Sequence, residues 1–350
     1  MELFSSLGQI GLQREDSTLK AVGEEAFLPS SNTESTGLFY LGQRQFSLLQ
    51  LSYGLRLDET EVRAASSGLN PVGGPIDAEA GLPGPGLQRS FSAQSASLAA
   101  GWQHNAWNFG STFSVSERAP AAAELFADGV HVATAAYEKG NPNLEVEKST
   151  HLDITAAWSG GKSKFSATAF TSEYDNYIGL LQLQGANSTT LVDGETVDVY
   201  QFSAIPARFQ GLELAGSVQT KLGSWKWQPG FQMDLVRGKR EDTGTNLPRQ
   251  TPIRLTLNSV LTQGNWMLKP EVQYVSSSKP GEGETRTASY TLLNLKAERE
   301  FAFGQTGGVL FIQLKNLTDR LAYSANTIET VRFFTPLPGK SATLGLKLYF

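Results

Sequence analysis

The sequence predicts an all-β protein whose strands form the antiparallel wall of a transmembrane β-barrel. Three observations carry this prediction. Apolar and polar residues alternate within the strand-like segments, short and long links alternate between those segments, and the chain ends on an aromatic residue. No window approaches the ~18 consecutive apolar residues of a membrane-spanning helix. A membrane strand needs no such window, because only every second residue faces lipid.

The period of two is clearest in three segments, 151–158, 253–258 and 293–298, where one face is apolar and the other carries charges and amides. A charge on the lipid face at mid-depth costs ~2–4 kcal/mol, so the polar faces are expected to point into the barrel. The charged residues placed inward are Asp153, Glu213, Arg254, Lys296 and Glu298. A soluble β-sandwich would show the same alternation with these residues in solvent.

About fourteen strand-like segments follow one another along the chain. They lie near 4–14, 33–43, 46–63, 88–103, 105–117, 146–160, 163–178, 198–221, 224–237, 250–263, 265–278, 287–303, 306–317 and 340–350. The long links between them are 15–32, 64–87, 118–145, 179–197, 238–249, 279–286 and 318–339. Long and short links alternate without a break from the first to the last. Outer-membrane barrels show this order, with long extracellular loops and short periplasmic turns.

The last segment supports a membrane barrel. Leu344, Leu346 and Leu348 alternate with polar residues or glycine, and Phe350 closes the chain. Aromatic residues form girdles at the membrane interface. This ending also resembles the terminal signal that the outer-membrane barrel assembly machinery recognises.

Composition limits the function. The 350-residue chain has no cysteine, which excludes disulfides and thiolate metal sites, and its net charge of -5 argues against a nucleic-acid partner. The N-terminal residues show neither the basic nor the apolar region of a secretory signal peptide. Nucleotide-binding glycine motifs, GxSxG and paired histidines at helical spacing are absent from the sequence, so we expect no enzyme.

The stretch from Ser116 to Asp153, which contains the link 118–145, is the longest with both turn chemistry and many polar groups. Helix-forming residues follow Pro120 up to Phe126, and Gly140-Asn141-Pro142-Asn143 is a strong turn signal. Gly140 permits left-handed backbone angles and the Asn141-Pro142 pair restricts the chain, so a tight, rigid turn is expected.

Several motifs in this link and after it resemble, in order, those of TonB-dependent outer-membrane receptors. They are Arg118-Ala119-Pro120, Glu124-Leu125-Phe126, the stretch 129–134 around His131, Tyr137-Glu138, 140–144, Glu147-Lys148-Ser149, Gly211-Leu212-Glu213, Thr251-Pro252, 314–319 with Asn316 and Asp319, and Pro338-Gly339-Lys340. No single motif is specific, but their shared order after residue 110 is.

The resemblance implies an outer-membrane receptor that imports a scarce solute with energy from an inner-membrane complex. A transported metal, siderophore or haem is the expected cargo, no intrinsic cofactor is expected, and the TonB complex would act through a plug domain. The chain shows no plug-like domain, and about fourteen strands where such transporters have 22. We therefore expect residues 1–350 to be the C-terminal part of a receptor barrel in the lipid of the bacterial outer membrane.

His131 is the sharpest candidate for contact with the solute. Asp128, Glu124 and Glu138 lie close to it in sequence, and imidazole with carboxylates suits zinc, copper, nickel or iron. The alternative is that His131 packs or hydrogen-bonds within the loop as a scaffold residue. His151 is expected to face the lumen beside Asp153, either as a ligand or as a hydrogen-bonded wall residue. His104 lies in a short turn and is expected to have no role.

Two further expectations concern the ends of strands. Arg118 and Glu147 flank the long link and either pair with each other or stay separately solvated. Asn316 and Asp319 are expected to form caps or Asx turns at the loop edge. Aromatic residues near loop ends, Tyr177, Tyr200, Phe333 and Phe334, either form part of the interface girdle or stack on a bulky chelate.

Two other functions stay open on the sequence alone. The chain could be a complete, passive fourteen-stranded porin or channel, or a soluble β-sandwich adhesin. A receptor requires proton-gradient-dependent uptake, a porin does not, and a soluble protein leaves washed membranes without detergent.

Overall fold

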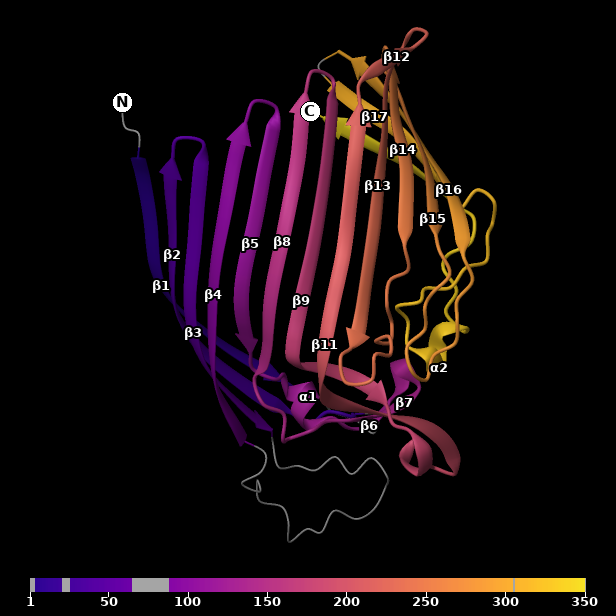
Figure 1. Cartoon of the computed structure of the whole chain (residues 1–350). Coiled ribbons are helices and arrows are strands. Elements are labelled where there is room, and N and C mark those ends of the chain that lie inside the picture. The colour runs from indigo at the N-terminus through magenta and orange to yellow at the C-terminus, as the bar shows by residue number, and fades with distance from the viewer. Residues whose placement is uncertain (1–3, 21–25, 65–87, 305, 350) are drawn as a thin grey trace.

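The computed structural model describes residues 4–20, 26–64, 88–304 and 306–349, and it confirms the all-β, antiparallel prediction. Fourteen long strands make up one wall (Figure 1). They are β1 (Phe4–Leu19), β2 (Ser31–Phe46), β3 (Leu49–Ala64), β4 (Gln88–His104), β5 (Trp107–Arg118), β8 (Glu147–Gly160), β9 (Ser163–Gln182), β11 (Glu195–Val218), β13 (Trp225–Arg240), β14 (Arg254–Gln263), β15 (Trp266–Val275), β16 (Tyr290–Phe303), β17 (Thr306–Lys315) and β18 (Ser341–Tyr349).

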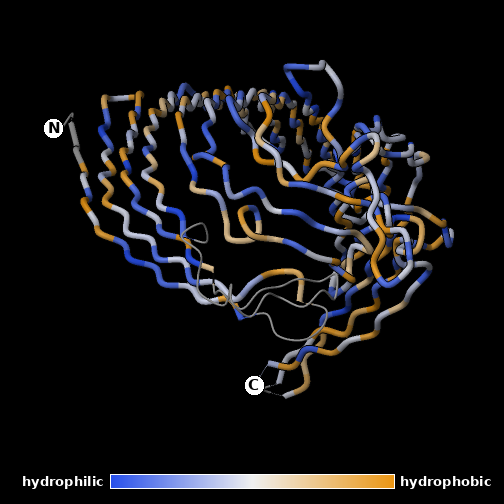
Figure 2. Tube along the Cα trace, turned by 90° about the horizontal axis from the view of Figure 1, so that it is seen from below, coloured by the Kyte–Doolittle hydropathy of each residue, from blue (hydrophilic) through white to orange (hydrophobic). Residues whose placement is uncertain are grey.

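Each long strand pairs antiparallel with the next one along the chain, from β1 with β2 to β17 with β18. Among the described residues, β1 and β18 do not pair with each other. Seen along the strands, the wall is a deep arc with the two ends of the chain at its two edges (Figure 2).

Short elements lie within or beside the predicted links. They are α1 (Ala122–Phe126), β6 (Asp128–His131), a 3-10 turn (Val132–Thr134), β7 (Ala136–Lys139), a second 3-10 turn (Gly185–Asn187), β10 (Thr189–Val192), β12 (Thr220–Leu222) and α2 (Glu329–Arg332). The helix formers after Pro120 thus form α1. The described parts of the long links gather at one end of the wall, and the short turns lie at the other, together with the start of β1 and the end of β18 (Figure 1).

Apolar and polar side chains occupy opposite faces of the wall, as the alternation predicts. Leu57 and Leu257 are 54% and 48% exposed on the outer face. On the inner face Arg254 pairs with Asp234 at 2.9 Å, and Glu298 pairs with both Lys269 and Lys296. The inner face is identified by α1, because this helix packs against Val62 of β3. The wall therefore has an apolar outside and a charged inside, as a membrane barrel requires.

Aromatic residues of the outer face gather near the short turns. All six tryptophans lie in strand segments close to such a turn. Around the turn between β4 and β5, Trp102 stacks on Phe109 and Phe109 on Trp107, with ring centroids 5.4 and 5.6 Å apart. Such a cluster is typical of the aromatic girdle at one membrane interface. No helix among the described residues is long and apolar enough to cross a membrane.

Candidate functional site

The links at the long-loop end fold together inside the mouth of the wall. We call the residues 118–146, 238–253, 276–289 and 316–340 the loop layer. Leu125 and Phe126 of α1 are buried in a cluster with Val62 and Phe91 of the wall. Farther along the wall, β7 adds a short parallel pairing to β11. Apolar anchoring of this kind holds the polar groups of the links at fixed positions over the lumen.

Arg118 joins the strand ends to the loop layer. Its guanidinium donates to Glu147 at 3.0 Å and to Glu124 at 2.8 Å, so the expected pair with Glu147 is present and Glu124 belongs to it. Glu124 also accepts the backbone N–H of Ala121 at the start of α1, and Glu147 that of Ile178. Glu124 is thereby bound to Arg118 and the helix end rather than placed beside His131.

The turn 140–143 lies directly against the backbone of α1. Gly140 does not adopt left-handed backbone angles, contrary to the expectation. A Cβ at Gly140 would lie 2.6 Å from the backbone carbon and oxygen of Leu125, so only glycine lets this turn lie on α1. Asn141 closes an Asx turn by accepting the N–H of Asn143 at 3.0 Å. Pro120 at the other side of α1 is fully buried, and the carbonyl of Pro142 accepts from Arg89.

His131 lies at the end of β6 and is held from two sides. Its Nδ1 lies 2.8 Å from Oε1 of Glu138, and its ring stacks on Phe27 with a centroid distance of 4.1 Å. Thr134 donates to the same carboxylate at 2.9 Å. Glu138 is buried, whereas the His131 side chain keeps 32% of its surface exposed. The structure therefore brings His131 and Glu138 together.

The other predicted ligands lie apart from this pair. Asp128 accepts the hydroxyl of Tyr137 at 2.8 Å, and burial together with this carboxylate raises the pKa of Tyr137. His151 faces the lumen from β8, bonded to Ser172 at 2.7 Å and 3.4 Å from Asp153. Within the described ranges, no group of three or more His, Cys, Asp or Glu side chains is arranged to hold a metal ion.

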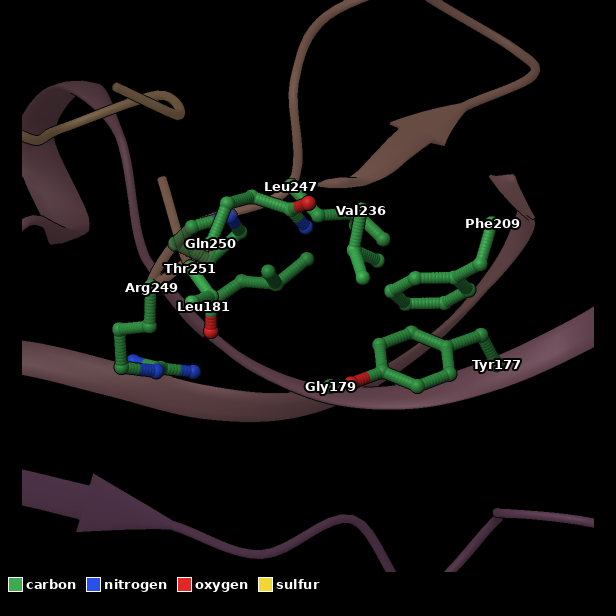
Figure 3. A pocket seen from close by; sticks show the side chains of 10 residues that line it. Tyr177, Gly179, Leu181, Phe209, Val236, Leu247, Arg249, Gln250 and Thr251 are labelled. Carbon is green, nitrogen blue, oxygen red and sulfur yellow. The ribbon is translucent and has the colours of Figure 1, made fainter. Parts of the chain in front are cut away.

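A cavity of about 250 Å³ opens on the inner face beneath the link 238–253. Tyr177 and Phe209 form one side of it, with ring centroids 5.4 Å apart and tilted by 65°, and Arg249 lies on the other side (Figure 3). The rest of the lining is Gly179, Leu181, Val236, Leu247, Pro248, Gln250 and Thr251. Tyr177 is therefore not a girdle residue. A β-bulge between β9 and β11, at Ile205 and Ala207, turns both Tyr174 and Tyr177 to the inner face.

Tyr200 of β11 packs against the loop layer and does not belong to a girdle. It is 4% exposed and packs with Ala136 and Ile328. Burial raises the pKa of Tyr200 to about 12, with the nearby Asp198 as the next cause. Phe333 packs edge-on against Tyr323 at 5.2 Å. Phe334 remains 84% exposed.

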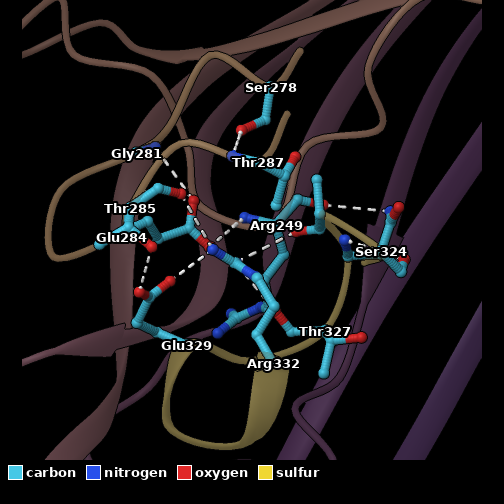
Figure 4. A network of polar contacts seen from close by, with 12 residues as sticks. Arg249, Ser278, Gly281, Glu284, Thr285, Thr287, Ser324, Thr327, Glu329 and Arg332 are labelled. Atoms are coloured by element: carbon cyan, nitrogen blue, oxygen red, sulfur yellow. Dashed lines mark hydrogen bonds and ion pairs between the residues drawn. The ribbon is translucent and has the colours of Figure 1, made fainter. Parts of the chain in front are cut away.

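A buried arginine, not anticipated from the sequence, binds the links to one another. Arg332 of α2 is 1% exposed and pairs with Glu284 at 2.7 Å and with Glu329 (Figure 4). Its guanidinium also donates to the carbonyls of Thr285, Ala325 and Thr327. Glu284 in turn accepts the backbone N–H groups of Arg249 and Gly281. Three links of the loop layer thus meet at one carboxylate.

The predicted turn residues near the C-terminus act at the loop edge. Asn316 is 2% exposed, accepts the N–H of Arg320 at 2.8 Å, and donates to the carbonyls of Arg320 and Pro338. Asp319 accepts the N–H of Lys340 at 2.8 Å, just before β18. Phe350 lies outside the described residues.

Comparison with known proteins agrees with this architecture. Residues 8–317 match the sequence model of the family described as "TonB dependent receptor-like, beta-barrel". The wall is similar to the solved structure of the copper transporter OprC, with a TM-score of 0.74, 16% identity, and coverage of 99% of this chain and 54% of that one. It is also similar to the FrpB iron transporter from Neisseria meningitidis, with a TM-score of 0.66, 15% identity, and coverage of 98% and 52%.

A third similar structure is the ferric-catecholate import receptor Fiu from K12 E. coli, with a TM-score of 0.60, 16% identity, and coverage of 91% of this chain and 45% of that one. The chain thus spans about half the length of the structures it matches. At these identities the likeness shows the fold, while the family follows from the match over 8–317. The chain belongs to the TonB-dependent receptors, a family of β-barrels of the bacterial outer membrane and not of enzymes.

Proposed function

We propose that the protein takes part in the energised uptake of a metal ion, a metal chelate or haem across the outer membrane. The observation that carries this proposal is the lumen-facing cavity under the loop layer, where Tyr177, Phe209 and Arg249 converge on one space. Aromatic rings offer stacking surfaces and a guanidinium binds anionic oxygens, a combination suited to a bulky anionic chelate. The copper and iron transporters among the similar structures support a metal-containing cargo.

The proposal extends to how the chain would work within a receptor. Residues 1–350 form the C-terminal part of the barrel wall, the barrel assembly machinery inserts that wall, and the TonB complex supplies energy through a plug domain. The family match and the coverage of about half of each similar structure support this arrangement.

His131 is the proposed metal contact. A carboxylate bonded to Nδ1 fixes the tautomer of a histidine and leaves Nε2 free to bind a metal, which is the usual arrangement behind metal-binding histidines. Glu138 occupies that position. Because His131 lies apart from Asp128 and Glu124, it would add one ligand to a metal that keeps its other ligands from the chelate.

Uptake of labelled cargo tests the function. Cells that carry the gene should accumulate labelled iron chelate, copper or haem, and a deletion strain or a protonophore should abolish this accumulation. Uptake that persists without the proton gradient would reject the energised mechanism. For the metal contact, His131→Ala should weaken copper binding to the purified protein, whereas His104→Ala, at the short-turn end, should not. Equal binding by both variants would exclude His131 as a ligand.

A further inference from the structure

Arg249 is held in a backbone conformation that a residue with a side chain rarely adopts. Its φ is 56°, in the left-handed region. Residues keep such angles where the contacts around them fix the backbone. Glu284 accepts the N–H of Arg249 at 2.9 Å, and the side-chain amide of Asn326 donates to the carbonyl of Arg249 at 3.2 Å. The same amide donates to the Thr251 hydroxyl at 2.9 Å. Side chains of two other links therefore fix the N–H and the C=O of Arg249.

The buried Arg332 organises both of these contacts. The Glu284 oxygen that accepts from Arg249 also lies 2.7 Å from Nη2 of Arg332 (Figure 4). The carbonyls of the two residues that flank Asn326 accept from the same guanidinium, at 3.2 and 2.9 Å. Arg332 is 1% exposed, and a buried charge that loses its partners is costly, so this arrangement resists displacement. One buried cation thus places an acceptor at the N–H of Arg249 and a donor at its C=O.

The side chain of Arg249 reaches the cavity that Tyr177 and Phe209 line (Figure 3). Among the described residues of the lining, Arg249 alone carries a charge. Its Nη2 donates to the carbonyl of Leu180 at 2.6 Å, and its guanidinium takes part in none of the ion pairs that the described residues form. This positive charge is therefore available to an occupant of the cavity, and its location depends on the fixed backbone of Arg249.

We propose that Asn326 is a positioning residue for Arg249 and thereby gives the cavity a preference for an anionic cargo over a neutral one. This inference rests on the proposed function, in which the cargo occupies the cavity. A guanidinium binds anionic oxygens through hydrogen bonds of narrow geometry, so a displaced backbone weakens them. A neutral aromatic chelate depends on ring contacts with Tyr177 and Phe209 instead, and these rings lie on the wall.

The link that carries Asn326 and Arg332 does not itself line the cavity, as far as its described residues show. The selectivity of the cavity is thus set from a neighbouring link, through the backbone of Arg249. Substitution of Asn326 should change which charge the cavity prefers without removing any group that touches the cargo.

The test uses the full chain, extracted from outer membranes into mild detergent, and two chelates with aromatic rings. The anionic probe is iron(III) tris-catecholate and the neutral probe is iron(III) tris-benzohydroxamate, both with labelled iron, and equilibrium dialysis measures each Kd. The unmodified protein should bind the anionic chelate more tightly. Asn326→Ala should weaken binding of the anionic chelate about tenfold and leave binding of the neutral one unchanged. The matched control, Asn187→Ala in the exposed 3-10 turn, should change neither.

A second substitution shows whether the effect passes through the guanidinium. In an Arg249→Gln background, Asn326→Ala should weaken binding of the anionic chelate no further, because the charge that it positions is gone. A further tenfold loss in that background would overturn the proposal. Equal loss of both chelates in Asn326→Ala would also overturn it, since that result indicates a structural role only. Unchanged binding in Asn326→Ala, or equal binding of the two chelates by the unmodified protein, would contradict it as well.

Hydrogen exchange separates this inference from the proposed function, because it needs no cargo. The amide of Arg249 should exchange slowly in the unmodified protein and about tenfold faster in Asn326→Ala, since the lost hydrogen bonds release the segment 247–253. If neither chelate binds the unmodified protein, the cavity does not serve the proposed function, and the exchange rate then decides the positioning role by itself. An unchanged exchange rate at Arg249 would overturn that role.

Discussion

Arg332 and Glu284 form an ion pair inside the loop layer, with Nη2 2.7 Å from Oε1 and side chains that are 1% and 8% exposed. Removing one partner of a buried pair leaves an uncompensated charge and typically costs ~3–5 kcal/mol. Arg332→Met should therefore lower the opening free energy of the links around Glu284 by about that amount, while the wall stays intact.

Hydrogen exchange of residues 279–286 and 325–331 measures this effect. The control is Arg14→Met, because Arg14 is 69% exposed and its pair with Glu34 spans 3.5 Å, a geometry worth only ~0–1 kcal/mol. If the amide hydrogens of these residues exchange no faster in Arg332→Met than in Arg14→Met, the buried pair does not stabilise the loop layer.

Gly140→Ala should loosen the contact between the turn 140–143 and α1. The added methyl group would meet the Leu125 backbone at 2.6 Å, and backbone cannot move aside as a flexible side chain can. A loss of about 1–3 kcal/mol is expected, seen as faster protease cleavage within 118–146. Gly101→Ala is the matched control, since a Cβ there has no neighbour within 4 Å. Equal cleavage of both variants would contradict the proposed close approach.

Leu181→Trp should fill the cavity between Tyr177 and Arg249 without adding charge. If the cargo occupies this space, the rate of labelled-chelate uptake at low concentration should fall about 10-fold or more, because the indole ring takes up the space that the cargo needs. The control, Leu257→Trp, places the same ring on the outer face. A normal uptake rate in Leu181→Trp would show that the solute does not pass through this cavity.

Tyr200 gives the loop layer a dependence on alkaline pH. Burial raises its pKa to about 12, above the unfolded value of about 10, so the unfolded chain loses this proton first. The stability that neutral Tyr200 contributes is complete below about pH 10 and is lost as pH rises through about 12. The phenolate absorbance of the unmodified protein minus that of Tyr200→Phe should titrate near pH 12. A midpoint near 10 would show that Tyr200 is solvated.

The wall could be predicted from the sequence because lipid imposes the period of two on every strand. The pair of Arg118 with Glu147 was foreseeable for a related reason: both residues end adjacent strands and flank the same link. The inward orientation of Tyr177 was not foreseeable. One β-bulge reverses which residues face inward, and the alternation of apolar and polar residues does not indicate where a bulge occurs. The burial of Arg332 was unpredictable because one of its two carboxylate partners, Glu284, comes from another link, and packing among links has no periodic signature.

The orientation of β14 in a bilayer tests the membrane-spanning wall most directly. The chain has no cysteine, so a single cysteine can be introduced at Leu255, Thr256, Leu257 or Asn258 in turn and spin-labelled without background. We expect labels at Leu255 and Leu257 to collide with oxygen dissolved in lipid, and labels at Thr256 and Asn258 to collide with a water-soluble nickel chelate. Equal access of the nickel chelate to all four positions would contradict a wall that separates lipid from a polar lumen.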